Sequence, residues 1–244
     1  MVVVGSLLVL LAAAAAGVSQ TLNITDVDSA GFYYSFWAED GANITLSGYG
    51  WYYPGLYNIQ WSENARFLGG KGWSAGSAQE IQFWSDHSQT GGNSLLSLYG
   101  WTTDPLVEYH ITEDFSTPDR FADLALKGTV TSDGSVYNIY EAKRVNETSI
   151  LGITTFSQYW SVRQSPRSSG FLTTENHFNA WAALGMPLGE FNYQIFAVES
   201  YSGSGSVDVK VSHVSFLGLE FLCHVFSLSH AEPSACRSTD NAAD

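Results

Sequence analysis

The sequence predicts an all-β sandwich or barrel with one α-helix packed on it. Segments that alternate apolar and polar residues recur along the body of the chain, and 23 glycines interrupt them at short intervals. Only one segment has helical periodicity. With 244 residues, of which 14 % are aromatic, the chain can build one large core, so we expect a single folded domain.

Three segments show the strand pattern most clearly. Gly128 to Tyr140 alternates on both sides of Asp133-Gly134, which predicts a β-hairpin with its turn at that dipeptide. Leu106 to Ile111 and Tyr193 to Tyr201 also alternate. The single helix is expected over Thr174 to Gly185, where Gly185 can adopt the left-handed conformation that ends a helix. Its apolar face is predicted to hold Phe178, Trp181, Ala182 and Leu184.

The charge balance excludes some classes of partner. The net charge is −14 and the chain has only 10 Lys and Arg residues. A nucleic-acid binder needs clustered cations to displace counterions from phosphate, so we expect no nucleic-acid partner. An anionic membrane surface is disfavoured for the same reason. A neutral polysaccharide substrate is compatible with this acidity.

The first residues have the profile of an export signal. Residues 2–18 form an apolar run that ends in small residues, which predicts a signal peptide over residues 1–19, cleaved between Ala16 and Gln20, and a secreted, extracellular protein. A membrane anchor is the alternative, although the run is shorter than the ~20 residues that usually span a bilayer. Glycosylation sequons at Asn23, Asn43 and Asn146 agree with export.

The body of the chain is expected to be free of disulfides and metals. Both cysteines, Cys223 and Cys236, lie near the C-terminus, so the body can hold no thiolate site, and no HExxH or paired histidine spacing is present. Residues 20–30 are interpreted as a lead-in and residues 31–212 as the folded body. Residues 213–244 differ in character, and one hypothesis is that they are an annotation error such as a translated intron.

Two glutamates stand out among the 24 acidic residues. A period of two places Glu108 on one strand face with Leu106 and His110, and places Glu199 on one face with Tyr193, Ile195, Ala197 and Tyr201. An unpaired carboxylate on such a face is costly to bury, and a shared cleft would explain both residues because burial and a neighbouring like charge separate two carboxyl pKa values. The alternative is that both glutamates lie on edge strands and point into solvent.

At these positions the chain resembles glycoside hydrolase family 11, the small endo-β-1,4-xylanases. The resemblance covers most of residues 31–212, in order and with similar spacing. The matching segments are Gly31 to Trp37, Gly69 to Trp73, Tyr99 to Thr102, Pro105 to Tyr109, Gly128 to Gly134, Gln158 to Arg163, Asn176 to Trp181 and Asn192 to Ile195.

The resemblance implies a β-jelly roll of two curved antiparallel sheets with one packed helix, and a cleft for xylan or arabinoxylan. It implies a retaining mechanism with Glu108 as nucleophile and Glu199 as acid/base, without cofactor or metal, in a monomer. Further substrate-binding positions carried over from the family are Trp37, Tyr99, Arg144, Gln158, Tyr193, Ser149 and Ile150. A hairpin over the cleft, called the thumb, is expected at about Val145 to Thr155.

Three residues depart from the family pattern. Arg66 stands where the family usually has Asn or Asp beside the acid/base, so we expect it to tune the pH dependence by favouring the ionised Glu199. His110 replaces a Tyr and could titrate near neutral pH. Thr148 replaces a Pro of the thumb, which releases a backbone constraint and creates the sequon at Asn146. Two alternatives follow: a catalytically weakened xylan-binding protein on the same fold, and an endoglucanase on a related jelly roll, which the extended match disfavours.

Overall fold

The computed structural model of the chain describes residues 22–47, 54–62 and 65–214. The described residues up to Ser212 belong to one compact unit, and beyond it only His213 and Val214 are described. The predicted signal peptide, both cysteines and the C-terminal residues 215–244 lie outside the described residues, so the predictions made for them stay predictions.

The described residues form twelve strands, one short 3₁₀-helix and one α-helix. In chain order the elements are β1 (Leu22–Val27), β2 (Tyr33–Ala38), β3 (Asn43–Ser47), β4 (Leu56–Ser62), β5 (Phe67–Ser74), β6 (Glu80–Thr103), β7 (Val107–Phe115), η1 (Pro118–Phe121), β8 (Leu126–Ser132), β9 (Ser135–Ser149), β10 (Gly152–Arg163), β11 (Ser169–Thr173), α1 (Thr174–Ala183) and β12 (Glu190–His213). β1 falls in the segment that the sequence suggested as a lead-in.

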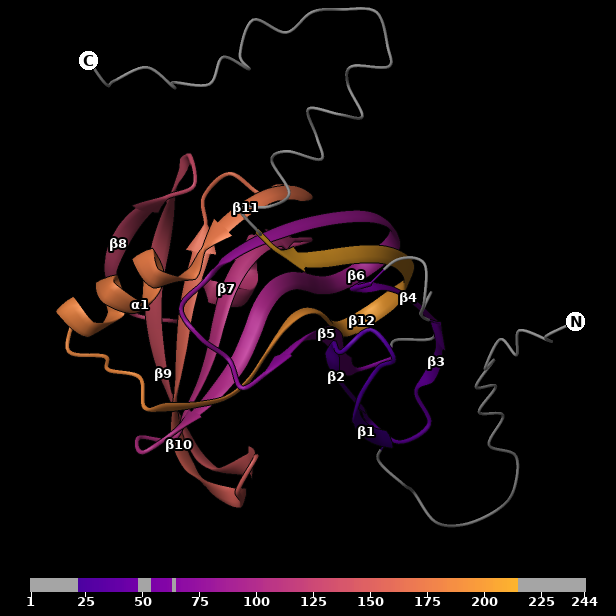
Figure 1. Cartoon of the computed structure of the whole chain (residues 1–244), viewed down its shortest axis with the longest axis horizontal. Helices are drawn as coiled ribbons and strands as arrows, with labels where there is room; N and C mark the ends of the chain where they lie inside the picture. The colour runs from indigo at the N-terminus through magenta and orange to yellow at the C-terminus, as the bar shows by residue number, and fades with distance from the viewer. Residues whose placement is uncertain (1–21, 48–53, 63–64, 215–244) are drawn as a thin grey trace, which may run out of the picture. The chain divides into compact units, whose positions relative to one another are not determined.

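Two long strands carry the sheet around a bend, as Figure 1 shows. The main path of the sheet runs β1-β2-β5-β12-β6-β7-β10-β9-β8. The first half of β12 pairs with β5 and its second half pairs with β4, while the first residues of β6 pair with β11 and its last residues pair with β7. The two layers of the predicted jelly roll are therefore continuous through β6 and β12, and the predicted all-β fold is confirmed.

The two faces of β12 separate two groups of buried side chains. Phe196 and Val198 belong to the large core, which takes apolar side chains from both halves of the sheet and from α1. Ile195 and Ala197 belong to a second cluster with Tyr99, Trp101, Phe156 and Tyr193. This alternation is the period of two expected for a strand buried on both faces, and it puts Glu199 on the side of the second cluster.

The predicted hairpin at Asp133-Gly134 is confirmed. Asp133 and Gly134 connect β8 to β9 with backbone φ angles of 48° and 75°, the left-handed values that a two-residue type I′ turn requires. The Asp133 carboxylate also accepts hydrogen bonds from the backbone N–H and the hydroxyl of Thr173 at 2.9 and 2.8 Å, so the turn is tied to the residue before α1.

The helix lies where it was predicted, but its buried face differs. α1 ends at Ala183, and Gly185 has a φ of 74°, as expected for a left-handed residue after a helix. Its buried residues are Thr174, His177 and Trp181, and Phe178 packs against the core. Ala182 and Leu184 are exposed, so that part of the prediction was wrong. Thr174, His177 and Trp181 are spaced three and four residues apart, so they lie on one side of the helix, and this side faces the sheet.

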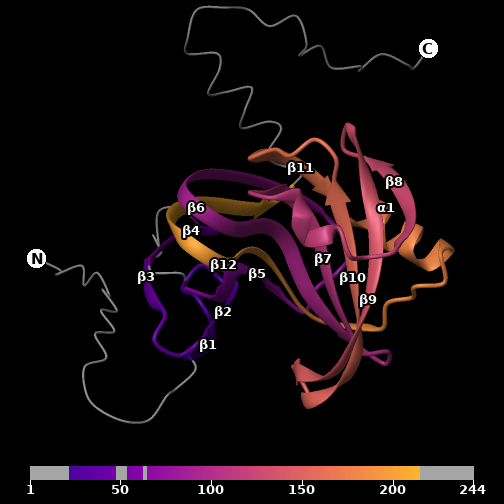
Figure 2. The ribbon, with the colours of Figure 1, turned by 180° about the vertical axis from the view of Figure 1, so that it is seen from behind.

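The hairpin of β9 and β10 extends beyond the rest of the sheet in both ribbon views (Figures 1 and 2). Its turn contains Gly152 at a φ of 88°, and Ser149 pairs with Gly152 across it. This hairpin corresponds to the segment Val145 to Thr155 that the sequence suggested as a thumb.

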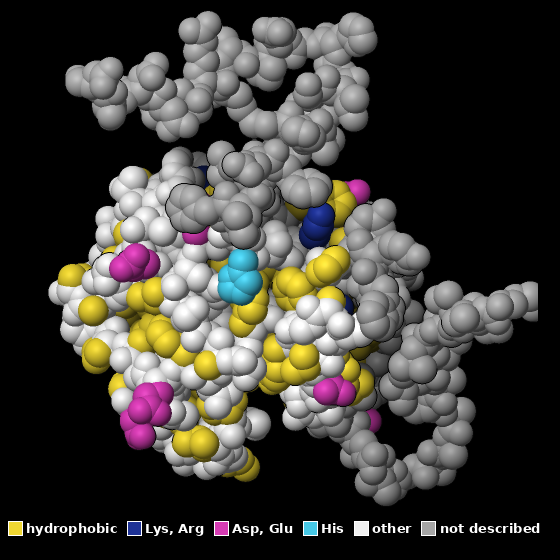
Figure 3. Space-filling model, in the orientation of Figure 1, with side chains coloured by type: hydrophobic (Ala, Val, Ile, Leu, Met, Phe, Trp, Pro, Cys, Tyr) yellow, Lys and Arg dark blue, Asp and Glu magenta, His cyan; other side chains and the backbone are white. Residues whose placement is uncertain are grey.

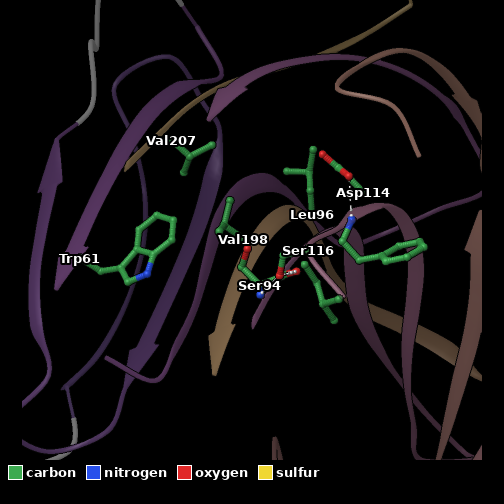
Figure 4. A pocket seen from close by; sticks show the side chains of 9 residues that line it. Trp61, Ser94, Leu96, Asp114, Ser116, Val198 and Val207 are labelled. Carbon is green, nitrogen blue, oxygen red and sulfur yellow. Dashed lines mark hydrogen bonds between the residues drawn. The ribbon is translucent and has the colours of Figure 1, made fainter. Parts of the chain in front are cut away.

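A small, partly open pocket lies between Trp61, Val207, Leu96 and Val198 (Figure 4). Ser94 and Ser116 also line it, and the Ser116 hydroxyl accepts a hydrogen bond from the Ser94 backbone N–H at 2.8 Å. Neither Glu108 nor Glu199 lines this pocket, so it is separate from the candidate site.

Candidate active site

Glu108 lies on β7 between two strands that supply its hydrogen-bond donors. In the register of the sheet it faces Trp101 of β6 on one side and Gln158 of β10 on the other. Its side chain is 14 % exposed. Because residues paired across neighbouring strands point to the same side of a sheet, this register places polar groups from both neighbours beside the carboxylate.

Both oxygens of Glu108 accept a hydrogen bond. The Tyr99 hydroxyl donates to Oε1 at 2.8 Å, and the Gln158 Nε2 donates to Oε2 at 2.6 Å. The Trp101 Nε1 in turn donates to the Tyr99 hydroxyl oxygen at 2.6 Å. Donors on both oxygens hold the carboxylate in one orientation and favour its ionised form.

Glu199 lies on the same side of the sheet as Trp37. Glu199 of β12 pairs with Leu68 of β5, and Leu68 pairs with Trp37 of β2, so the three side chains form a row across adjacent strands. With about 4.8 Å between neighbouring strands, Trp37 lies about 10 Å from Glu199 along this row. Trp37 is 38 % exposed, which leaves an aromatic surface open near the carboxyl group.

The surroundings of Glu199 differ from those of Glu108. Burial raises the pKa of Glu199, while the charge of Arg120, the Tyr201 hydroxyl and the charges of Arg144 and Arg66 lower it, and Arg120 contributes most to this lowering. Its Oε2 atom is buried and has no hydrogen-bond partner among the described residues. One carboxyl group is therefore held by two donors and the other has an oxygen to spare.

Burial dominates the acid–base behaviour of both glutamates. It raises the pKa of Glu108 to about 7, against the lowering influence of Tyr99 and Gln158, and the negative charge of Glu199 adds to the rise. Burial likewise raises the pKa of Glu199, which Arg120 and Tyr201 partly offset. Since each charge raises the pKa of the other, the pair ionises in two steps and carries one negative charge over the intermediate pH range.

The other predicted substrate contacts divide into two groups. Arg144 of β9 is close enough to lower the pKa of both glutamates, Tyr193 belongs to the second cluster, and Ile150 packs against that cluster from the β9–β10 turn. Ser149 instead serves the turn, because its hydroxyl donates to the Gly152 carbonyl at 2.7 Å and accepts from the Leu151 backbone N–H at 3.0 Å.

Arg66 has a nearer acidic partner than Glu199. Its guanidinium pairs with Glu39 at 2.7 Å, and the two side chains are 52 % and 44 % exposed. Arg66 does lower the pKa of Glu199, but it ranks behind Arg120 and Arg144. Arg66 therefore has a smaller influence on the pKa of Glu199 than the prediction implied, and its pH-tuning role stays a prediction.

The expectation that His110 titrates near neutral pH was wrong. His110 is 2 % exposed and stacks on Trp160 with a ring distance of 3.6 Å and an angle of 11°. Burial, together with the charges of Arg120 and Arg144, lowers the pKa of His110 well below its usual value. The imidazole is therefore neutral at physiological pH, although its Nε2 lies 3.9 Å from Glu108 Oε1.

Sequence reasoning missed Arg120. This residue lies in η1, between two strands, where no periodicity marks a side chain as inward-facing. The sequence offered only a weak indication of its importance, because Arg120 is one of only 10 Lys and Arg residues in the chain. It also lies between the segments that match the family, which end at Tyr109 and resume at Gly128. The strand pattern of the sequence placed Tyr201 on the face of Glu199, but only the structure shows that Tyr201 accepts a hydrogen bond from Arg120 and that Trp101 donates one to Tyr99.

The described residues contain neither a membrane-spanning helix nor a cluster of metal ligands. No helix in the described ranges combines the length and the apolar character that a bilayer crossing requires. Within the same part of the chain, no three His, Cys, Asp or Glu side chains converge as metal ligands would. Among the side chains coloured in Figure 3, the basic residues do not form a patch on the face shown.

Comparison with known proteins identifies the family. The sequence profile described as "Glycosyl hydrolases family 11" matches residues 29–210. The chain belongs to glycoside hydrolase family 11. This membership accounts for the jelly roll, and it makes Glu108 and Glu199 the natural candidates for the two carboxyl groups that such enzymes use.

Several fungal proteins are similar to this family 11 chain. It is 53 % identical over 184 residues to "Ethylene-inducing xylanase 1" of Botryotinia fuckeliana (strain B05.10), a match of 75 % of this chain and 64 % of the relative. It is 53 % identical over 182 residues to "Endo-1,4-beta-xylanase B" of Phanerodontia chrysosporium, covering 75 % of this chain and 61 % of the relative. The chain thus spans less than two thirds of both relatives.

A solved structure gives the same result at the level of the fold. One chain from a structural comparison of two major endo-1,4-beta-xylanases of Trichoderma reesei superimposes with a TM-score of 0.66 at 43 % sequence identity. The superposition covers 80 % of this chain and 100 % of that one.

Proposed function

We propose that this chain is a secreted endo-β-1,4-xylanase that cleaves internal xylosidic bonds of xylan or arabinoxylan with retention of configuration. The observation that carries the proposal is the pair of partly buried glutamates on one face of the sheet, one held by two donors and one with an unpartnered oxygen. The family and the xylanase names of its relatives support the substrate class.

In the first chemical step, an ionised Glu108 attacks the anomeric carbon of the sugar while a protonated Glu199 gives its proton to the departing glycosidic oxygen. The C–O bond to the leaving sugar breaks as the bond to the Glu108 carboxylate forms. Tyr99 and Gln158 orient Glu108 for this attack, since they occupy both of its oxygens in the described structure.

In the second step, Glu199 acts as a base and takes a proton from a water molecule, whose oxygen attacks the same anomeric carbon. The bond to Glu108 breaks, the carboxylate is regenerated, and Glu199 is protonated for the next cycle. Two inversions at one carbon give net retention, and such enzymes place their carboxyl groups about 5–5.5 Å apart. Neither step requires a metal or a cofactor.

The remaining roles are proposals of the same kind. Trp37 offers an exposed aromatic surface on which a sugar ring can stack. Arg144 and Tyr193 are close enough to Glu108 to interact with it electrostatically, and Ile150 packs against the cluster that contains Tyr193. The proposed signal peptide over residues 1–19, the body over residues 31–212 and the monomeric state follow from the sequence and the family resemblance.

The decisive experiment measures reducing-sugar release from xylan and from soluble cellulose, with wild type and Glu108→Gln, together with NMR detection of the first-formed anomer. We expect release from xylan alone, a loss of at least a thousandfold in the variant, and the β-anomer as first product. Binding of xylan without release by wild type would favour the weakened xylan-binding protein, and the α-anomer would exclude the retaining mechanism.

A further inference from the structure

The 3₁₀-helix η1 brings a cation close to the acid/base. Its last residue, Phe121, is buried and anchors the segment by stacking on Tyr140 at 6.0 Å and meeting Trp160 edge-on at 5.4 Å. Arg120 precedes this anchor directly, so the packing of Phe121 determines where the guanidinium lies.

Arg120 is directed at Tyr201. Its guanidinium carbon lies 3.5 Å from the centre of the Tyr201 ring and 5.6 Å from the centre of the Trp160 ring, and its Nη2 donates a hydrogen bond to the Tyr201 hydroxyl oxygen. A cation over an aromatic face is attracted by the ring as well as by the hydroxyl oxygen, and the attraction grows when water is excluded. Tyr201 is thus held from one side by Arg120.

Tyr201 lies two residues after Glu199 on β12, so both side chains point to the same side of the strand, and the Tyr201 hydroxyl acts with the Arg120 charge to lower the pKa of Glu199 against the rise that burial causes. A hydroxyl that accepts a bond from a cation becomes a stronger donor of its own proton. Arg120 thus contacts the residue that neighbours Glu199 on this side of β12, and the Tyr201 hydroxyl keeps its own proton free to donate.

We propose that Arg120 is a positioning residue for Glu199, which orients the carboxyl group through the Tyr201 hydroxyl and places beside it a positive charge that favours its ionised form. This inference rests on the assignment of Glu199 as acid/base proposed above. If Arg120 has this role, the upper pH limit of activity is lower than it would be if burial alone determined the pKa of Glu199.

The other groups around Glu199 do not replace this charge. Glu108 of β7 is negative and opposes ionisation of Glu199, while Arg144 of β9 and Arg66 before β5 favour it less than Arg120 does. His110 of β7 is neutral because it is buried. Tyr99 and Tyr193 stay protonated because burial raises their pKa values.

Replacing Arg120 by a neutral residue should raise the pKa of Glu199. Removing a cation makes the Glu199 carboxylate less stable, so its pKa rises and the proton required for leaving-group departure persists to higher pH. An opposite charge close to a carboxyl group lowers its pKa by about one to three units, and we take about one for a guanidinium that contacts Tyr201 and not Glu199 itself. The alkaline limb of the kcat/KM profile should then move upward by about one pH unit.

The test compares wild type with Arg120→Met, which removes the charge and keeps the length, and with Arg120→Lys, which keeps the charge. The matched control is Lys127→Met, which removes a cation that is 39 % exposed and pairs with Glu141 at 3.0 Å on β9. Each protein is measured by its kcat/KM profile on xylan and by ¹³C NMR titration of labelled glutamate side chains, with Glu199→Gln assigning the resonance.

We expect Arg120→Met to move both the alkaline limb and the Glu199 titration upward by about one pH unit, Arg120→Lys to restore most of the wild-type position, and Lys127→Met to leave both in place. If Arg120→Met does not fold, Tyr201→Phe serves instead, with a smaller shift in the same direction. An unshifted Glu199 titration in a folded variant, or an equal shift in Lys127→Met, would overturn the proposal. Absent xylanase activity in wild type would overturn the proposed function alone, because the NMR titration reports on Arg120 without turnover.

Discussion

The Trp101 indole N–H donates to the Tyr99 hydroxyl oxygen over 2.6 Å, and this contact decides where Tyr99 sends its own proton. A phenol has one proton to donate, and the Trp101 contact occupies the oxygen as an acceptor. The Tyr99 proton therefore points to Glu108 Oε1, 2.8 Å away. Trp101, two residues after Tyr99 on the same strand, thus makes Tyr99 the donor in its hydrogen bond to the proposed nucleophile Glu108.

Replacing Trp101 should weaken catalysis more than it weakens folding. We expect Trp101→Phe to lower kcat about tenfold, because it removes a donor worth about 1–2 kcal/mol to the orientation of Tyr99 while keeping an aromatic ring against Phe156. Tyr99→Phe, which removes the bond to Glu108 itself, should cost more. The measurement is kcat with the thermal midpoint as control, and an unchanged kcat in Trp101→Phe would contradict the orienting role.

Gln158 should control the acidic limb of the pH profile. Its Nε2 donates to the ionised form of Glu108, so Gln158→Met removes a group that lowers the pKa of Glu108 from the value that burial sets. The pKa of Glu108 then rises, the nucleophile protonates at higher pH, and the acidic limb of kcat/KM moves upward by roughly one pH unit. Profiles of both proteins on xylan test this, and a shift of the limb toward lower pH would contradict it.

His177 should make the fold sensitive to acid. It is fully buried in α1 against Tyr137, and burial lowers its pKa to about 3. In the unfolded chain the pKa of this histidine is about 6.5, so the unfolded state binds a proton at a higher pH than the folded state does. The free energy of unfolding therefore decreases as the pH falls from about 6.5 toward about 3. At pH 4.5 this loss amounts to about 2.5 kcal/mol.

The control for this effect is His177→Phe, which keeps a ring at the same site. We expect urea unfolding at pH 7.5 and at pH 4.5 to show a smaller acid-induced loss of stability in the variant than in wild type. Equal losses in the two proteins would show that His177 does not contribute to acid sensitivity.

A glycan attached at the Asn146 sequon of the β9–β10 hairpin should hinder the binding of polymeric substrate. Asn146 and Thr148 are exposed, and the hairpin carries Ile150 against the second cluster. A glycan at Asn146 would crowd a long xylan chain but not a short oligosaccharide. Material from a glycosylating host should therefore show either no glycan by intact mass or a rate on polymeric xylan that rises in Asn146→Gln. An occupied site with unchanged rates on both substrates would contradict this.

Sequence periodicity was most informative about which side chains share one face of a single strand. The alternation around Glu108 and Glu199 correctly placed Tyr193, Ile195 and Ala197 on one face, because side chains of a strand alternate whatever the neighbours are. The Asp133-Gly134 turn was equally local, since only residues that tolerate positive φ fit it. For α1, the inner face was partly misjudged because Ala182 and Leu184 are apolar but the sheet meets the helix along Thr174, His177 and Trp181.

The amino-acid sequence by itself determined the all-β class, the hairpin, the helix and the two glutamates, since these depend on local periodicity, on turn chemistry and on a family pattern spread along the chain. The tertiary structure alone decided that His110 is neutral against Trp160 and that Arg66 pairs with Glu39. It also brought Arg120 to Tyr201, 81 residues away. Charges and pKa values depend on burial and on neighbours distant in sequence, and the folding of the sheet sets both.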